Sequence, residues 1–123
     1  MDRNALAKAM LDFGQQIQPD PKFAPMYNHY QADLEFVHSL TTEKILALLE
    51  KLSDKQIQEA FLHAYEGHLD LVKTTSGYTI RYQTQQHFPS GLEKVPYAPA
   101  LHGLWKFMAM QLDDEADEDL EES

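Results

Sequence analysis

The alternation of apolar and polar positions along this chain predicts five helices. Apolar residues recur three and four positions apart in five segments, the spacing that places side chains on one face of a helix. The expected starts are Asp2, Pro25, Thr41 or Thr42, Ser53 and Pro99, which are residue types that cap or open helices. The five apolar faces consist of Leu6, Met10, Phe13 and Ile17; Tyr27, Tyr30, Leu34 and Val37; Ile45, Leu48, Leu49 and Leu52; Ile57, Ala60, Phe61, Ala64 and Tyr65; and Leu101, Leu104, Trp105, Met108 and Leu112.

The helix that begins after Ser53 has the strongest local signals and is predicted to be the central element. Ser53 is followed three residues later by glutamine, the spacing of a capping box. Leu62 and Leu69 lie beside the main apolar stripe, so the apolar arc is wide, as in a helix that neighbours cover on several sides. We expect Phe61 and the only tryptophan, Trp105, to lie in the core.

Two readings are open for the residues after Tyr65. In the first, which we favour, the helix continues with His68 on its apolar face, and a strand-like segment follows from 77 to 83. In the second, the helix stops at Gly67 and residues 68–71 begin a β-hairpin with Ser76-Gly77 as its turn. The return strand of that hairpin would place three apolar residues on one face: Tyr78, Ile80 and Tyr82.

These patterns predict a mainly α fold: a compact single-domain bundle of about five helices, with a short β-strand or hairpin near residues 70–84. The alternative is an α+β fold. The length of 123 residues fits one domain with one core. The absence of cysteine excludes disulfides, thiolate nucleophiles and cysteine-ligated zinc. No apolar run reaches the roughly 18 residues of a membrane span, and the first residues do not resemble a signal peptide, so we expect a cytoplasmic protein with no membrane partner.

The formal charge of −10 is concentrated at the end of the chain. Residues 113–123 contain eight acidic residues and no basic one, which leaves about −2 for residues 1–112. Because like charges repel and little apolar surface is present there, we expect a folded domain over 1–112 and a disordered acidic tail over 113–123. The basic residues are scattered and the tail repels phosphate, so no direct nucleic-acid partner is expected.

One histidine could take part in chemistry if the helix after Ser53 continues. Glu59, His63, Glu66 and Asp70 would then share one helix face, where they could bind a divalent metal or provide a general base. A solvated acidic face is the other reading, and we favour it because charged residues at helical spacing are mostly exposed.

The remaining motifs point away from catalysis. Glu35 and His38 have the Glu-x-x-His spacing of carboxylate-bridged di-iron bundles, but the second such pair that those sites need does not occur. Ser90 has no nucleophile-elbow context, and no phosphate-binding glycine motif is present. We therefore expect no enzyme activity, no cofactor and no metal.

The functional expectation is binding to another protein, as an inhibitor, immunity-type factor, antagonist or adaptor. Tyrosine is favoured at interfaces, and four aromatic residues fall in the segment least explained by core spacing: Tyr78, Tyr82, Phe88 and Tyr97. A basic partner surface could also contact acidic residues of the tail: Asp113, Asp114, Glu115, Asp117, Glu118 and Asp119. Two alternatives stay open: a histidine and carboxylate metal-binding protein or enzyme, and a protein whose acidic tail competes with nucleic acid for a basic partner.

Overall fold

A computed structural model of the chain describes residues 1–17, 30–85, 87 and 93–122, and their side chains as far as Leu112. Within these residues the backbone forms five α-helices, one short 3₁₀-helix and a two-stranded antiparallel sheet. In chain order the elements are α1 (Arg3–Gln15), α2 (Tyr30–Ser39), α3 (Thr42–Leu49), α4 (Asp54–His63), η2 (Ala64–Gly67), β1 (Leu69–Thr74), β2 (Gly77–Tyr82) and α5 (Tyr97–Glu122). The prediction of a mainly helical protein with a short hairpin is confirmed.

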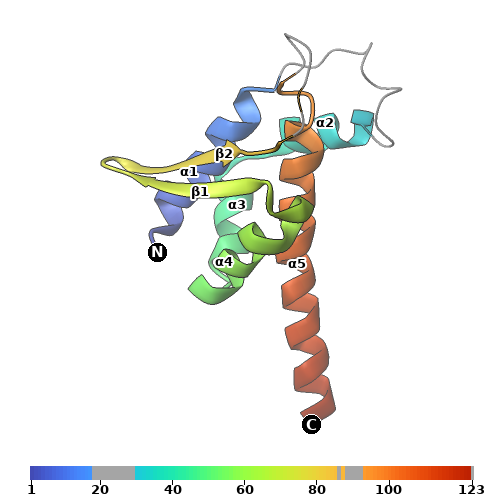
Figure 1. The fold of residues 1–123 in the computed structure, drawn as a ribbon. Helices are drawn as coiled ribbons and strands as arrows, with labels where there is room; N and C mark the ends of the chain where they lie inside the picture. Colours follow the sequence, from blue (N-terminus) through green and yellow to red (C-terminus); the bar gives the residue numbers. More distant parts are fainter. Residues whose placement is uncertain (18–29, 86, 88–92, 123) are drawn as a thin grey trace.

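Helix α5 is the central element of the fold, because α1, α2, α4 and η2 all pack against it (Figure 1). Helix α3 and strand β2 pack on α1, whereas β1 contacts α4. The central element is therefore α5, and the prediction that the helix after Ser53 is central is wrong. The core side chains that are fully excluded from solvent include Leu6, Met10, Ile45, Leu49, Ile57, Leu101, Leu104 and Met108.

Three of the predicted helix starts are confirmed by their caps. The Asp2 side chain accepts hydrogen bonds from the backbone N–H groups of Asn4 and Ala5 at the start of α1. Thr41 caps α3 in the same manner. Ser53 and Gln56 form the predicted capping box of α4, with bonds of 2.8 and 3.1 Å. These signals are local, which is why sequence alone identifies them.

Of the other two predicted helix starts, one lies outside the described residues and the other differs from the observed start. The structure describes α2 from Tyr30 onward, so the predicted start at Pro25 lies outside the described residues. Helix α5 begins at Tyr97, which places Pro99 inside its first turn rather than at its first position. A proline is tolerated there because the first N–H groups of a helix have no partner within the helix.

The favoured reading of the segment after Tyr65 is wrong, and the hairpin reading is confirmed. Helix α4 ends at His63, and the chain then turns through three residues with positive φ: Tyr65 at 51°, Glu66 at 58° and Gly67 at 76°. His68 consequently lies on no helix face. A left-handed conformation costs roughly 1–2 kcal/mol for a residue with a side chain. The strand ladder that follows, together with the packing of η2 on α5, offsets this cost.

The hairpin register places the turn one residue earlier than predicted. Strands β1 and β2 pair from Leu69↔Tyr82 to Thr74↔Gly77, so the two turn residues are 75 and 76 rather than Ser76-Gly77. Alternate residues of a strand share a face, so Tyr78, Ile80 and Tyr82 lie together as the hairpin reading predicted. Ile80 is buried, and this face is therefore the one turned toward the core.

Two predictions about individual apolar residues need correction. Phe61 is buried as expected, but Leu62, which was assigned to the wide apolar arc of α4, is 67% exposed. Trp105 is only half-buried, and its ring meets the edge of Phe36 at 5.5 Å between centroids. The apolar arc of α4 is narrower than predicted because the helix ends at His63, before Leu69 can join it.

The backbone of α5 remains helical beyond Leu112, as far as Glu122, where charge repulsion alone predicted a disordered tail. No proline or glycine occurs between Leu104 and Ser123 to end the helix. The last turns of α5 extend past the other elements (Figure 1). The division into a domain over 1–112 and an independent segment over 113–123 stays a prediction. None of the described helices is long and apolar enough to cross a membrane.

Candidate functional site

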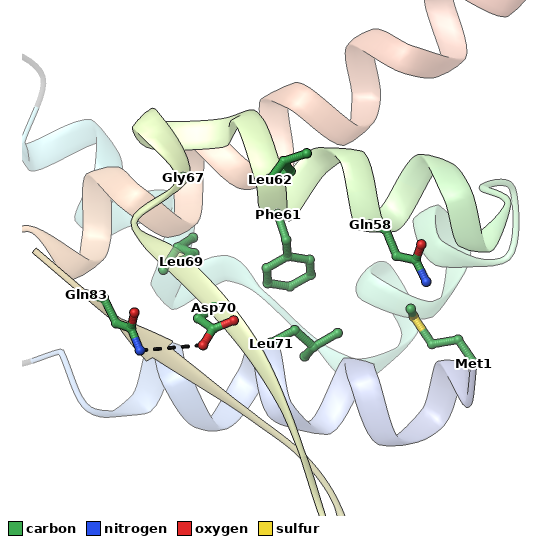
Figure 2. Close-up of a pocket in the computed structure, with 9 residues that line it drawn as sticks. All are labelled: Met1, Gln58, Phe61, Leu62, Gly67, Leu69, Asp70, Leu71 and Gln83. Carbon is green, nitrogen blue, oxygen red and sulfur yellow. Dashed lines mark hydrogen bonds between the residues drawn. The ribbon is translucent and has the colours of Figure 1, made fainter.

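The main candidate site is a groove of about 480 Å³ between α4 and β1 (Figure 2). The groove is open to solvent along the side of β1 that faces away from β2, and we call it the β1 groove. Its walls come from four separate parts of the chain: the N-terminus, α4, the left-handed turn and the hairpin. It is lined by Met1, Gln58, Phe61, Leu62, Gly67, Leu69, Asp70, Leu71 and Gln83.

The floor of the β1 groove is apolar. Phe61 is buried and its ring points from α4 toward β1, while Leu69 is 2% exposed (Figure 2). Leu71 is half-buried and continues the apolar surface along the strand. Leu62 lies on the rim, where most of its side chain contacts solvent. Such an exposed apolar rim beside a concave apolar floor is typical of a site that another molecule covers.

Three polar side chains line the β1 groove: Gln58, Asp70 and Gln83. Asp70 accepts a hydrogen bond of 3.5 Å from the side chain of Gln83, and its carboxylate lies 3.8 Å from Arg81 across the strand pair. Asp70 is the one acidic or basic side chain in the groove lining of the described residues. The β1 groove therefore offers apolar contact and hydrogen bonding, and it contains no pair of side chains suited to acid–base chemistry.

The left-handed turn determines where β1 lies relative to α4. At Gly67 a Cβ atom would stand 2.8 Å from the carbonyl oxygen of Leu62, so only glycine permits this close return of the chain. The β1 groove could not be predicted from the sequence as long as a helix was favoured through this turn. The available signals were Gly67 itself, considered there as a helix stop, and Leu62, which lies off the apolar stripe of α4.

The N-terminal wall of the β1 groove is fixed by polar contacts of Arg3. Its guanidinium donates to the backbone oxygens of Leu49 and Leu52 and to the carboxylate of Asp54. The amino group of Met1 lies 3.1 Å from the same carboxylate. The hydrogen bond from Arg3, followed by that from the amino group, holds the pKa of Asp54 below its usual value. These contacts tie the start of α1 to the corner between α3 and α4.

Two of the four predicted aromatic site residues come together, and neither of them lines the β1 groove. Tyr97 stacks on Phe13 with 4.6 Å between ring centroids, and Tyr82 lies 5.5 Å from Tyr97. Tyr78 lies four residues before Tyr82 on the same strand face and is half-buried. Phe88 lies outside the described residues. The two tyrosines thus pack within the molecule, and their role as partner-binding residues stays a prediction.

The rings of Tyr65 and His68 join this group and complete what we call the aromatic cluster. Their centroids lie 6.2 and 5.5 Å from that of Tyr82. The cluster connects η2, the end of β2 and the start of α5. It is a packing element that helps to hold the left-handed turn in place, because Tyr65 belongs to both.

The predicted histidine and carboxylate faces are not formed as expected. Glu59 and His63 share α4, but the helix ends there, and Glu66 and Asp70 leave that face. Glu35 and His38 are both exposed on α2. Within the described residues no three side chains of histidine, aspartate or glutamate gather closely enough to hold a metal ion. The side chains of Asp113, Asp114, Glu115, Asp117, Glu118 and Asp119 lie outside the described residues.

A second polar feature, not predicted from the sequence, joins α2 to α5. Asp33 is 7% exposed, and its Oδ1 lies 2.6 Å from Nδ1 of His102. A carboxylate oxygen accepts, so the imidazole Nδ1–H donates. The His102 ring also stacks on Phe36 at 4.2 Å between centroids. Residues 69 positions apart form this pair, and no local signal connects them.

Comparison with protein-family models, curated proteins and solved structures finds no match to this chain. Function must therefore be argued from the geometry of the molecule.

Proposed function

We propose that this protein is a non-enzymatic binding protein that holds part of another protein in the β1 groove. The observation that carries the proposal is the exposed side chain of Leu62 beside an open apolar floor. An isolated exposed leucine needs no explanation, but Leu62 belongs to the lining of a groove of about 480 Å³ and adds exposed apolar surface at its rim. Phe61 and Leu71 supply the apolar contacts that partner side chains need for anchoring.

The chemistry of the β1 groove favours binding over catalysis. More than half of its lining residues are apolar, and Asp70 lies beside Arg81 and Gln83 rather than beside a histidine or a second carboxylate. An inhibitor, immunity-type factor, antagonist or adaptor needs only such a surface. Cytoplasmic location and the absence of a nucleic-acid or membrane partner belong to the same proposal.

The acidic segment supports a partner that carries positive charge. Eight carboxylates within 113–122 attract a basic surface over a Debye length of about 8 Å at physiological salt. This attraction would speed the first encounter, while the apolar groove would determine how long the complex lasts.

The test is a selection of peptides from a random displayed library on the full chain. Selected peptides should bind the wild-type protein and lose about tenfold or more in affinity for Leu62→Glu, because a buried charge would replace an apolar contact. Met110→Glu is the matched control, since Met110 is 59% exposed and lies on α5. Both variants should keep the wild-type melting temperature.

Two outcomes would contradict the proposal. The first is a library that yields no binder to the folded protein. The second is a set of peptides whose affinity falls equally with Leu62→Glu and Met110→Glu, since the β1 groove would then make no special contribution.

A further inference from the structure

The hydrogen-bonding pattern of the hairpin leaves the outer edge of β1 available. The backbone N–H of Gln83 donates to the oxygen of His68 at 2.7 Å, which makes Leu69↔Tyr82 a pair without mutual hydrogen bonds. Antiparallel pairs alternate, so the residues of β1 that bond to β2 are Asp70, Val72 and Thr74. The N–H and C=O groups of the residues between them, including Leu71 and Lys73, consequently point away from β2.

Burial determines which part of this edge another chain could reach. Leu69 is almost completely covered, whereas Leu71 is half-buried and Lys73 is exposed. In the part of the chain that the structure describes, neither Leu71 nor Lys73 makes a further backbone hydrogen bond. The accessible edge therefore offers two N–H donors and two C=O acceptors, spaced as in a strand. An unpaired row of this kind is a template for an added strand.

The edge and the β1 groove adjoin each other at Leu71. Its backbone belongs to the open edge and its side chain lines the groove. A strand added beside β1 would continue the sheet at about 4.8 Å, and every second side chain would point to the face that carries Leu71. Those side chains would enter the apolar groove between β1 and α4 (Figure 2).

We propose that the outer edge of β1 binds an extended segment of the partner protein as a third strand, with alternate apolar side chains in the β1 groove. This inference rests on the proposed function and specifies how the partner is held. Backbone hydrogen bonds provide affinity in this mode, and the groove selects residues with apolar side chains at every second position.

The occupant is a basic segment of a different protein rather than a second copy of this chain. Two copies would each bring a formal charge of −10, most of it on the acidic end of α5, and this repulsion opposes association of two copies. Asp70 lines the groove and Glu66, whose side chain is 88% exposed, directly precedes the lining residue Gly67. Their contacts with Arg81 and His68 are long, at 3.8 and 3.5 Å, so basic residues beside the apolar positions of the partner are favoured.

Backbone methylation of a selected peptide tests this mode of binding. The probes are variants of the tightest peptide from the display experiment, each carrying one N-methyl group. Strand addition predicts an alternating result: methylation of every second residue reduces affinity about tenfold or more, because a donor to β1 is removed, and methylation of the intervening residues has little effect.

Amide hydrogen exchange of the protein gives an independent readout. When the unmethylated peptide is bound, exchange at Leu71 and Lys73 should slow several-fold more than at Val72, whose amide already pairs with β2. Uniform sensitivity to methylation, or unchanged exchange at Leu71 and Lys73, would overturn strand addition. If the same peptide still distinguishes Leu62→Glu from Met110→Glu, the proposed function stands; if no peptide is selected, both proposals fail.

Discussion

At the scale of single residues, the left-handed turn after α4 imposes backbone strain on residues that carry a side chain. Glu66 holds φ of 58°, and its largely exposed side chain lies 3.5 Å from His68, a contact that solvent screens and that stabilises little. Glu66→Gly should raise the free energy of unfolding by about 0.5–1 kcal/mol, because the strain it removes exceeds the extra entropy of glycine in the unfolded chain. Urea denaturation measures this difference.

The neighbouring position provides the opposite control. Gly67→Ala introduces a Cβ 2.8 Å from a backbone oxygen at φ of 76°, and should lower the free energy of unfolding by at least about 1–2 kcal/mol. A stabilised Gly67→Ala variant together with a destabilised Glu66→Gly variant would show that the chain does not turn in this way.

Asp54 gives stability a defined dependence on pH. Arg3 and the amino group of Met1 hold its folded pKa below the usual value, so its contribution is present above about pH 4 and is lost as pH falls through the lowered pKa. Asp54→Asn should therefore melt at a lower temperature than the wild type at pH 7, and the gap should close in strong acid. A gap that is constant from neutral to strongly acidic pH would contradict this assignment.

At the scale of elements, sequence signals succeeded where the determining contacts are local. The Asp2 and Ser53 caps form hydrogen bonds within the first turn of their helices, so the local sequence predicted both helix starts. The conformation of the residues after His63 depends instead on the pairing of β1 with β2 and on the packing of η2 against α5. These contacts are long-range, and the apolar spacing from 57 to 72 fits a helix equally well.

The buried pair between Asp33 and His102 should be an important link between α2 and α5. Asp33→Ala should lower the free energy of unfolding by about 1–3 kcal/mol, because the imidazole N–H would lose its partner in a mostly buried position. Glu35→Ala removes the same charge from an exposed position of α2 and should change stability by less than about 0.5 kcal/mol. Equal losses from both variants would argue against this role.

At the scale of the whole molecule, the acidic end of α5 should contribute little to folding. Its eight carboxylates lie at the C-terminal end of a helix, where negative charge is unfavourable, and no basic residue balances them. A chain that ends at Leu112 should keep nearly the full melting temperature. It should also bind a lysine-rich selected peptide more slowly at low salt, with the difference fading as salt rises.

A large loss of stability on truncation would instead place part of the acidic segment in the folded body. Equal association rates at low salt would remove its role in attracting a partner and leave solubility as its use. The two measurements are independent, because melting concerns the free protein and association concerns the encounter.

The candidate site itself could not be predicted, because it forms only when the chain folds. Its lining comes from the N-terminus, α4, the left-handed turn and the hairpin, which meet only after folding. Tyr82 and Tyr97, chosen for their residue type, lie in the aromatic cluster, and their role as partner-binding residues stays a prediction. Residue type alone does not distinguish a tyrosine that packs internally from one that meets a partner.

The measurement that tests the central claim most directly is the mapping of amide chemical shifts while a selected peptide is added to the wild-type protein. Binding in the β1 groove predicts that the largest changes occur at Phe61, Leu62, Leu71 and Lys73. The account would be contradicted if those signals stayed constant while the largest changes occurred around the smaller pocket of about 310 Å³ between α1 and α2, which is lined by Leu11, Gly14, Gln15, Ile17, Val37, His38 and Leu40.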